Sequence, residues 1–148
     1  MNIKKRVDNN IPFSLHDSRI IKISVEAERL TLTLDKVYEY NGDSEKSYPA
    51  TMLFEGIDYE ECDVIVFDSE LGYGLFTGTR YRMREFVDKF PNGIFEIITE
   101  TYSGYDTVFR GYIYKNGCVY GSGIISIWTM GDVILSTNYA SNKKDDRI

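Results

Sequence analysis

His16 is the only histidine among the 148 residues and is followed directly by Asp17, so imidazole chemistry would have to occur here. In an extended segment, His16 shares a side with Ser14 and Ser18 while Asp17 points the other way, so adjacency alone does not make a His-Asp dyad. A serine triad would also need a nucleophile elbow, and the chain contains no G-x-S-x-G. His16 and Asp17 are the catalytic candidates, but the favoured interpretation is structural. We expect His16 to bond a backbone carbonyl and Asp17 to cap a turn.

A second group of chemistry-bearing residues is acidic and consists of Asp58, Glu60, Glu61 and Asp63. Their spacing does not match an EF-hand loop with its glycine, so calcium binding is not predicted. A solvated acidic loop is the simplest interpretation. The alternative is a docking surface for a basic protein, which the formal net charge of -6 at pH 7 would favour.

The remaining motifs predict no metal site and no cofactor. One histidine excludes a site built on several, and Cys62 and Cys118 have no metal-ligand spacing. We expect both cysteines to be buried, reduced thiols. The glycines between residues 72 and 78 match neither a P-loop nor a dinucleotide-binding motif.

The charge pattern does not favour nucleic-acid binding. The densest internal basic group is Arg80, Arg82 and Arg84, which Glu85 and Asp88 interrupt, and a solvated helix face explains it. The first residues lack the apolar core of a signal peptide, and no apolar run approaches membrane-spanning length. We therefore expect a cytoplasmic protein without membrane attachment.

Alternation of apolar and polar residues predicts a mainly β chain. One short helix is expected near residues 79–90, with Thr79 as its cap and Pro91 as its stop. The expected strands cover residues 21–25, 30–34, 37–40, 48–54, 64–67, 94–102, 107–115, 118–128 and 133–138.

The sequence Asn116-Gly117 between two strand-like runs predicts a two-residue type I′ hairpin turn. This turn would set Tyr112 opposite Gly121 and Arg110 opposite Gly123, while the other face of the hairpin faces the core. A functional interpretation is a shallow groove beside Arg110 and Tyr112 that binds a peptide or small ligand. The favoured alternative is an aromatic ring covering a cross-strand glycine.

These elements together predict a single domain over residues 1–148, of mainly β (α+β) class. An antiparallel sheet or meander is expected, closing as a sandwich or as a partly open barrel. A polar arm over residues 1–12 would precede it, and a frayed tail over residues 141–148 would follow.

The segment Pro12-Phe13-Ser14-Leu15-His16-Asp17-Ser18-Arg19-Ile20-Ile21-Lys22-Ile23, followed by a short turn and Leu30-Thr31-Leu32-Thr33-Leu34, resembles the start of small uncharacterised bacterial β-rich domains. Some of these are grouped with immunity proteins of toxin–antitoxin-like competition systems. The resemblance covers about the first quarter of the chain. It implies a binding protein that neutralises a partner, and it brings no catalytic residues with it.

Three hypotheses about function follow. The leading one is a non-enzymatic, bacterial protein-binding domain, of which an immunity protein is one form, with a basic protein as partner. The alternative is a small enzyme or ligand-binding domain that uses His16 and a pocket near Arg110 and Tyr112. A homo-oligomer assembled through exposed strand edges is a third hypothesis that the sequence does not rank.

Overall fold

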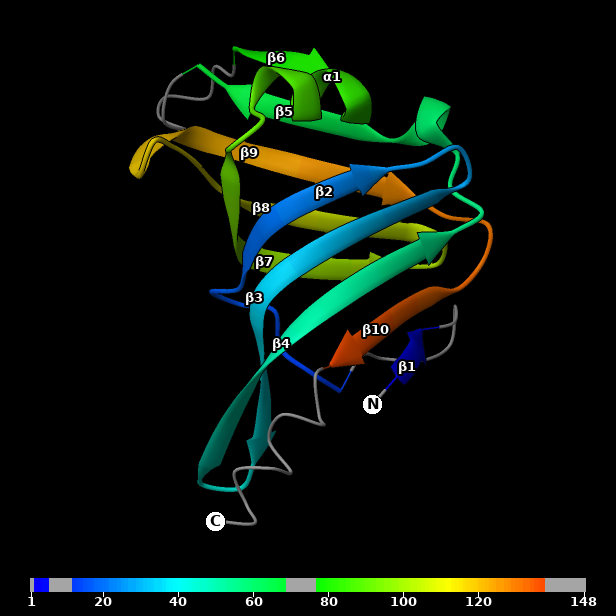
Figure 1. Cartoon of the computed structure of the whole chain (residues 1–148), viewed down its shortest axis with the longest axis vertical. Helices are drawn as coiled ribbons and strands as arrows, with labels where there is room; N and C mark the ends of the chain where they lie inside the picture. The colour runs from blue at the N-terminus through cyan, green and yellow to red at the C-terminus, as the bar shows by residue number, and fades with distance from the viewer. Residues whose placement is uncertain (1, 6–11, 69–76, 138–148) are drawn as a thin grey trace.

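The computed structural model describes residues 2–5, 12–68 and 77–137, and in these ranges the chain is mainly β, as predicted (Figure 1). Ten strands form one sheet in the order β1-β10-β4-β3-β2-β7-β8-β9-β5-β6, and every neighbouring pair is antiparallel. The strands are β1 Asn2–Lys5, β2 Arg19–Val25, β3 Arg29–Asn41, β4 Ser44–Glu55, β5 Asp63–Phe67, β6 Gly78–Tyr81, β7 Ile94–Ser103, β8 Asp106–Lys115, β9 Cys118–Trp128 and β10 Val133–Thr137. A 3-10 helix, η1, spans Tyr59–Glu61, and the helix α1 spans Met83–Lys89.

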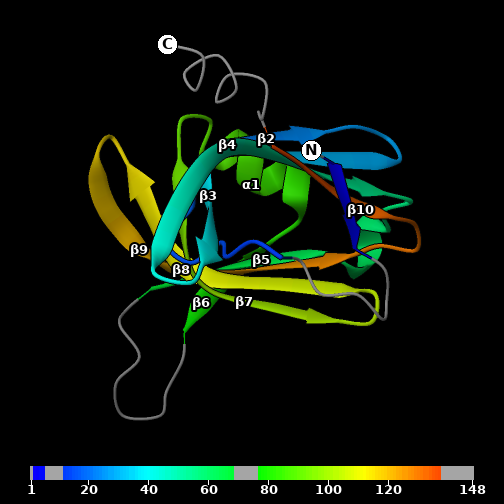
Figure 2. The same cartoon turned by 90° about the horizontal axis from the view of Figure 1, so that it is seen from below.

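The sheet folds over on itself where β2 meets β7. These two strands pair only through Arg19 with Glu96 and Ile20 with Phe95. The first half (β1, β10, β4, β3 and β2) therefore faces the second half (β7, β8, β9, β5 and β6) across the core, as Figures 1 and 2 show. Both layers therefore belong to one continuous sheet. The arrangement has the two facing layers of the predicted sandwich and the continuous sheet of the predicted partly open barrel.

The core fills the space between the two halves. In the first half, the buried side chains of Leu30 and Leu32 lie opposite Phe54 and Met52 across the β3–β4 pair. In the second half, inward-facing side chains such as Phe109 on β8 meet them. Each fully buried side chain of this kind contributes about 1.5–3 kcal/mol of hydrophobic stabilisation. The alternation seen in the sequence therefore reflects which face of each strand lines the core.

The β8–β9 hairpin has the predicted turn but not the predicted register. Asn116 and Gly117 have φ of 54° and 79°, as a type I′ turn requires. A β-bulge then follows, so Tyr112 pairs with Ser122 and Arg110 pairs with Ile124. The predicted pairing of these two residues with glycines is wrong by one residue, because a bulge gives one strand an extra residue.

The helix α1 is shorter than predicted. Residues 79–81 pair with β5 as part of β6 instead of forming the first helical turn, so Thr79 is not the cap. The helix begins after Arg82, whose backbone N–H donates to Oε1 of Glu85 at 3.1 Å. Within the described ranges, no helix is long and apolar enough to cross a membrane.

The ends of the chain were predicted as a polar arm and a frayed tail. Residues 2–5, inside the predicted arm, form β1 and pair with β10. The predicted tail over residues 141–148 lies outside the described residues, as does most of the glycine-containing segment before β6.

Candidate functional site

Four connections between strands meet at one end of the molecule, on the right of Figure 1, which we call the acidic end. They are the β2–β3 turn, the β4–β5 connection with η1, the β7–β8 turn and the β9–β10 connection. Backbone hydrogen bonds tie them together: Ile57 N donates to Glu28 O (3.3 Å), Asp58 N to Trp128 O (3.2 Å), Thr129 N to Tyr105 O (3.0 Å) and Met130 N to Gly56 O (2.9 Å). These bonds make the end a defined surface, because each connection is held by another.

Acidic residues are concentrated in these connections and the strand ends beside them. Residues 26–29, 55–63, 103–106 and 129–132 contain one basic residue, Arg29, against nine acidic ones. The acidic residues are Glu26, Glu28, Glu55, Asp58, Glu60, Glu61, Asp63, Asp106 and Asp132. The predicted acidic binding residues at positions 58–63 are therefore joined by others that lie far away in the sequence.

Arginines from β6 and from the start of α1 neutralise part of this charge. Arg80 forms an ion pair with Asp63, and an Arg82 Nη lies 3.5 Å from a carboxylate oxygen of Glu60. The interpretation of the three arginines as one helix face is thus wrong for Arg80, which lies in a strand, and for Arg82, which precedes the first residue of α1. The carboxylate of Asp58 caps η1 by accepting the N–H of Glu60 at 3.1 Å.

Three further carboxylates of the acidic end are not neutralised in this way by any described residue. In the part of the chain that the structure describes, no basic side chain forms an ion pair with Glu28, Glu55 or Glu61. Glu28 and Glu61 are also exposed to solvent. Their charge is therefore available to a partner.

Exposed apolar side chains accompany these charges. Met130 in the β9–β10 connection is 63% exposed, and Tyr105 in the β7–β8 turn is 45% exposed. The ring of Tyr105 lies 5.3 Å from that of Trp128, centroid to centroid. Flexible methionine and rigid aromatic side chains are residue types that bind partner proteins well.

Cys62 is buried under the acidic end. Its thiol donates to the carbonyl of Asp58 at 3.2 Å and accepts the N–H of Trp128 at 3.3 Å. Burial is the main reason why the pKa of Cys62 is raised to about 11, so it is a poor nucleophile at neutral pH. Cys118 is exposed, so the prediction of two buried thiols is correct for Cys62 and wrong for Cys118.

A second polar region, the His16 turn (residues 13–18), packs against β7. Nδ1 of His16 lies 2.6 Å from the carbonyl oxygen of Ile98, and the N–H of Asp17 donates to Ile97 O at 2.8 Å. The expected bond from His16 to a backbone carbonyl is confirmed. The expected separation of the two side chains is wrong, because the positive φ of Asp17 (69°) turns the chain and brings its Oδ2 to 3.5 Å from His16 Nε2.

Glu100 and Tyr102 on β7 complete the His16 turn. Oε2 of Glu100 accepts the N–H of Leu15 at 2.6 Å, and Oε1 accepts the hydroxyl of Tyr102 at 3.1 Å. Burial raises the pKa of Glu100, although the bonds from Leu15 and Tyr102 lower it in part. Glu100 was not predicted as a site residue, because no local sequence signal links it to a turn 85 residues earlier.

Arg110 and Tyr112 lie on the outer face of the second half. Their cross-strand neighbours on β7 are Thr99 and Glu96. The glycines that were expected beside them, at positions 121 and 123, pair instead with Ile113 and Gly111 of the core-facing side. The predicted glycine groove is therefore absent at this place. Ligand binding by Arg110 and Tyr112 stays a prediction.

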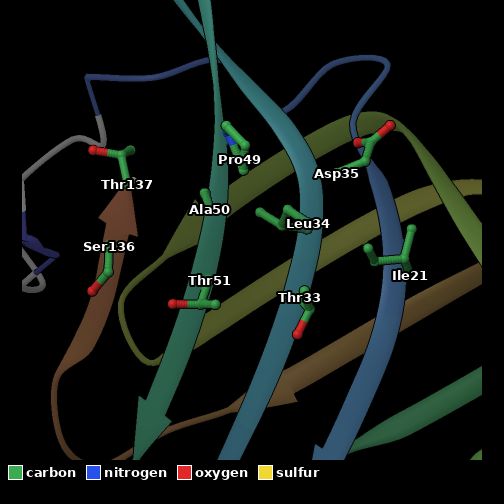
Figure 3. Close-up of a pocket in the computed structure, with 9 residues that line it drawn as sticks. All are labelled: Ile21, Thr33, Leu34, Asp35, Pro49, Ala50, Thr51, Ser136 and Thr137. Atoms are coloured by element: carbon green, nitrogen blue, oxygen red, sulfur yellow. The ribbon is translucent and has the colours of Figure 1, made fainter. Parts of the chain in front are cut away.

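An open groove of about 400 Å³ lies on the first half, where β3 bends (Figure 3). Thr33, Thr51 and Ser136 stand in one row across β3, β4 and β10, and cross-strand hydroxyl pairs of this kind stabilise a sheet. Asp35 lies at its side, and Oδ1 of this residue accepts the N–H groups of Arg19 and Lys36, both at 2.7 Å. The carboxylate of Asp35 therefore holds the backbone beside the groove.

The comparisons with known proteins contribute no further evidence. No family model, no curated protein and no solved structure matches the chain. In the described ranges, no group of three or more His, Cys, Asp or Glu side chains is placed to hold a metal ion. The candidate sites are therefore ranked on geometry alone.

Proposed function

We propose that this protein is a binding domain that recognises a basic segment of another protein through the acidic end. One observation carries the proposal: the exposed carboxylates of Glu28 and Glu61, which form no ion pair in the described ranges, share one end of the molecule with the exposed side chains of Met130 and Tyr105. A basic segment with one apolar residue is complementary to such a surface in both charge and polarity.

The charges and the apolar groups would have different effects on binding. Charges at the edge of an interface chiefly raise the association rate, and salt weakens that effect because the Debye length is about 8 Å at physiological ionic strength. Met130 and Tyr105, next to Trp128, would anchor the partner and slow its dissociation. We therefore expect salt-dependent association and an apolar contribution that salt leaves largely unchanged.

The His16 turn supports the alternative, a small enzyme, less well. Nδ1 of His16 is bonded to a backbone carbonyl, and both oxygens of Glu100 accept hydrogen bonds from the protein. A general base needs a lone pair within reach of a substrate proton. Nε2 of His16 lies 3.5 Å from Asp17 Oδ2, and neither His16 nor Glu100 lines the groove of Figure 3. The inhibition of a partner, as by an immunity protein, rests only on the resemblance of the first quarter of the chain, to which the comparisons add no support.

The test uses two labelled peptides and two charge-reversed proteins. The first peptide carries several lysines and a central leucine, and the second has glutamate in place of each lysine. One variant combines Glu28→Lys with Glu61→Lys, and the control combines Asp43→Lys with Glu45→Lys at the far end of the β3–β4 hairpin. Both variants change the net charge equally, and all four positions are exposed.

Fluorescence anisotropy should show that the wild-type protein and the control bind the lysine peptide. Binding should weaken by about tenfold in the Glu28/Glu61 variant, since two exposed pairs worth about 0.2–1 kcal/mol each are replaced by repulsion. Equal weakening in both variants would mean that only the net charge matters and would refute the proposed site. Binding of the glutamate peptide with equal affinity would refute it as well.

A further inference from the structure

The sheet opens between β2 and β7, and the helix α1 closes the opening. Pairing with β7 ends at Ile20, whereas β2 continues to Val25. The helix contacts β2 of the first half and also β5 and β6 of the second half (Figures 1 and 2). At this edge the helix supplies a hydrogen-bond donor to one carbonyl of β2. Nη2 of Arg84 donates to the carbonyl oxygen of Val25 at 3.4 Å.

The opening contains a cavity of about 180 Å³ between β2, α1 and the start of β7. Its walls are chiefly apolar and include the side chains of Ile20, Ile23, Phe86, Val87, Phe90 and Ile94. An apolar cavity of roughly 150 Å³ with leucine, isoleucine and phenylalanine walls stays dry and takes up a molecule such as benzene. The cavity beside α1 is of similar size and its walls are largely apolar, but it opens to solvent.

One charged residue lines this cavity. Lys22 on β2 is exposed, and no acidic residue belongs to the lining. Among the described residues, no carboxylate forms an ion pair with Lys22. The neighbouring Ile21 is 47% exposed and extends the apolar wall towards solvent. Lys22 is thus the one lining residue whose charge can meet the anionic end of a ligand, while the largely apolar walls suit an apolar body.

We infer that this cavity binds a small monocarboxylate with a short alkyl body, whose chain lies between β2 and α1 and whose carboxylate pairs with Lys22. Burial of each methylene group contributes about 0.8 kcal/mol, so the chain supplies most of the affinity. The ammonium group of Lys22 then selects the anion over a neutral molecule of the same length. This inference is independent of the acidic end, because no residue is shared between the two sites.

The first experiment compares hexanoate with hexanamide by titration into ¹⁵N-labelled protein. Hexanoate should shift the amide signals of Ile23, Val87 and Gly93, and hexanamide should bind about fivefold more weakly, the factor expected for a partly exposed charge pair. The variant Lys22→Gln should bind both molecules equally. Lys36→Gln, a charge change elsewhere on the first half, should leave the preference for hexanoate unchanged.

The second experiment blocks the cavity. Val87 is half-buried at its wall, so Val87→Phe should fill the space and abolish the hexanoate shifts, while the far-ultraviolet circular dichroism stays native. The control Val119→Phe changes an exposed residue of β9 outside the cavity and should bind like wild type. Native-like Val87→Phe that still binds hexanoate would overturn the inference. A wild-type protein that binds neither probe, or that binds both equally, would overturn it without any variant.

Discussion

The His16 turn and the acidic end are both polar regions built from turns. Polar groups of the first bond to the protein itself, whereas several carboxylates of the second face solvent. At the His16 turn, His16 Nδ1 and both oxygens of Glu100 bond to groups of the protein itself. At the acidic end, Glu28 and Glu61 are exposed, and neither takes part in an ion pair within the described ranges.

This difference separates polar groups that hold the fold from those available to a partner. A buried group that loses its hydrogen bond costs free energy, so a substitution there lowers stability. An exposed charge without a partner contributes little to stability, so a substitution there affects association instead. The comparison therefore predicts large stability effects in one region and small ones in the other.

The largest effect on stability is expected for Glu100→Ala. This change leaves the partly buried N–H of Leu15 without its acceptor, and an unsatisfied buried donor costs about 1–3 kcal/mol. Urea denaturation should show a loss of that size. Glu100→Gln is the matched control, because its amide can still accept from Leu15 and can donate to the hydroxyl of Tyr102. Equal losses for the two variants would show that the hydrogen bonds at Glu100 do not hold the turn.

The raised pKa of Glu100 also predicts that the stability of the protein depends on pH. Because burial raises the pKa of Glu100 in the folded protein, the proton binds more tightly there than in the unfolded chain. Its contribution to stability is complete below the unfolded pKa of about 4.3 and is lost as the pH rises through the raised folded pKa. The stability of Glu100→Gln relative to wild type should therefore increase from pH 4 to pH 7. A difference that is constant across this range would contradict the raised pKa.

A smaller loss is expected for His16→Ala. Its side chain is 56% exposed, so removal of the contact with Ile98 O leaves a carbonyl that water can reach. The cost should be about 0.5–1.5 kcal/mol, the net contribution of an ordinary hydrogen bond. Thermal unfolding measures it, with Asp17→Asn as a control that keeps the bond to Ile98. A loss above that of Glu100→Ala would place the histidine, and not the glutamate, at the centre of the turn.

Most strands were predictable from the sequence because their signals are local, whereas β1 and β6 were predicted as an arm and as part of a helix. The strand predicted over residues 118–128 is observed as Cys118–Trp128, since alternation and the Asn116-Gly117 turn fix both of its ends. Pairing between distant strands has no such local signal. The bulge in β9 and the short β2–β7 junction have no such signal, so the predicted hairpin register was wrong by one residue and the choice between a sandwich and a barrel stayed open.

The candidate sites were predictable only in part for the same reason. The acidic residues 58–63 were visible in the sequence, but Glu28 joins them only through a hydrogen bond from Ile57, 29 positions later in the chain. Met130 and Tyr105 gave no signal as single residues. The role of Arg80 and Arg82 as partners of Asp63 and Glu60 likewise depends on the β5–β6 pairing.

The smallest effect on stability is expected at the acidic end. The variant with Glu28→Lys and Glu61→Lys raises the formal net charge from -6 to -2, because each substitution changes the charge by two. Since neither carboxylate has an ion-pair partner in the described ranges, the free energy of unfolding should change by at most about 0.5 kcal/mol. Guanidinium denaturation is suited to this measurement, because the salt screens long-range repulsion. A loss above 1 kcal/mol would show that these carboxylates support the fold, and the contrast between the two regions would then fail.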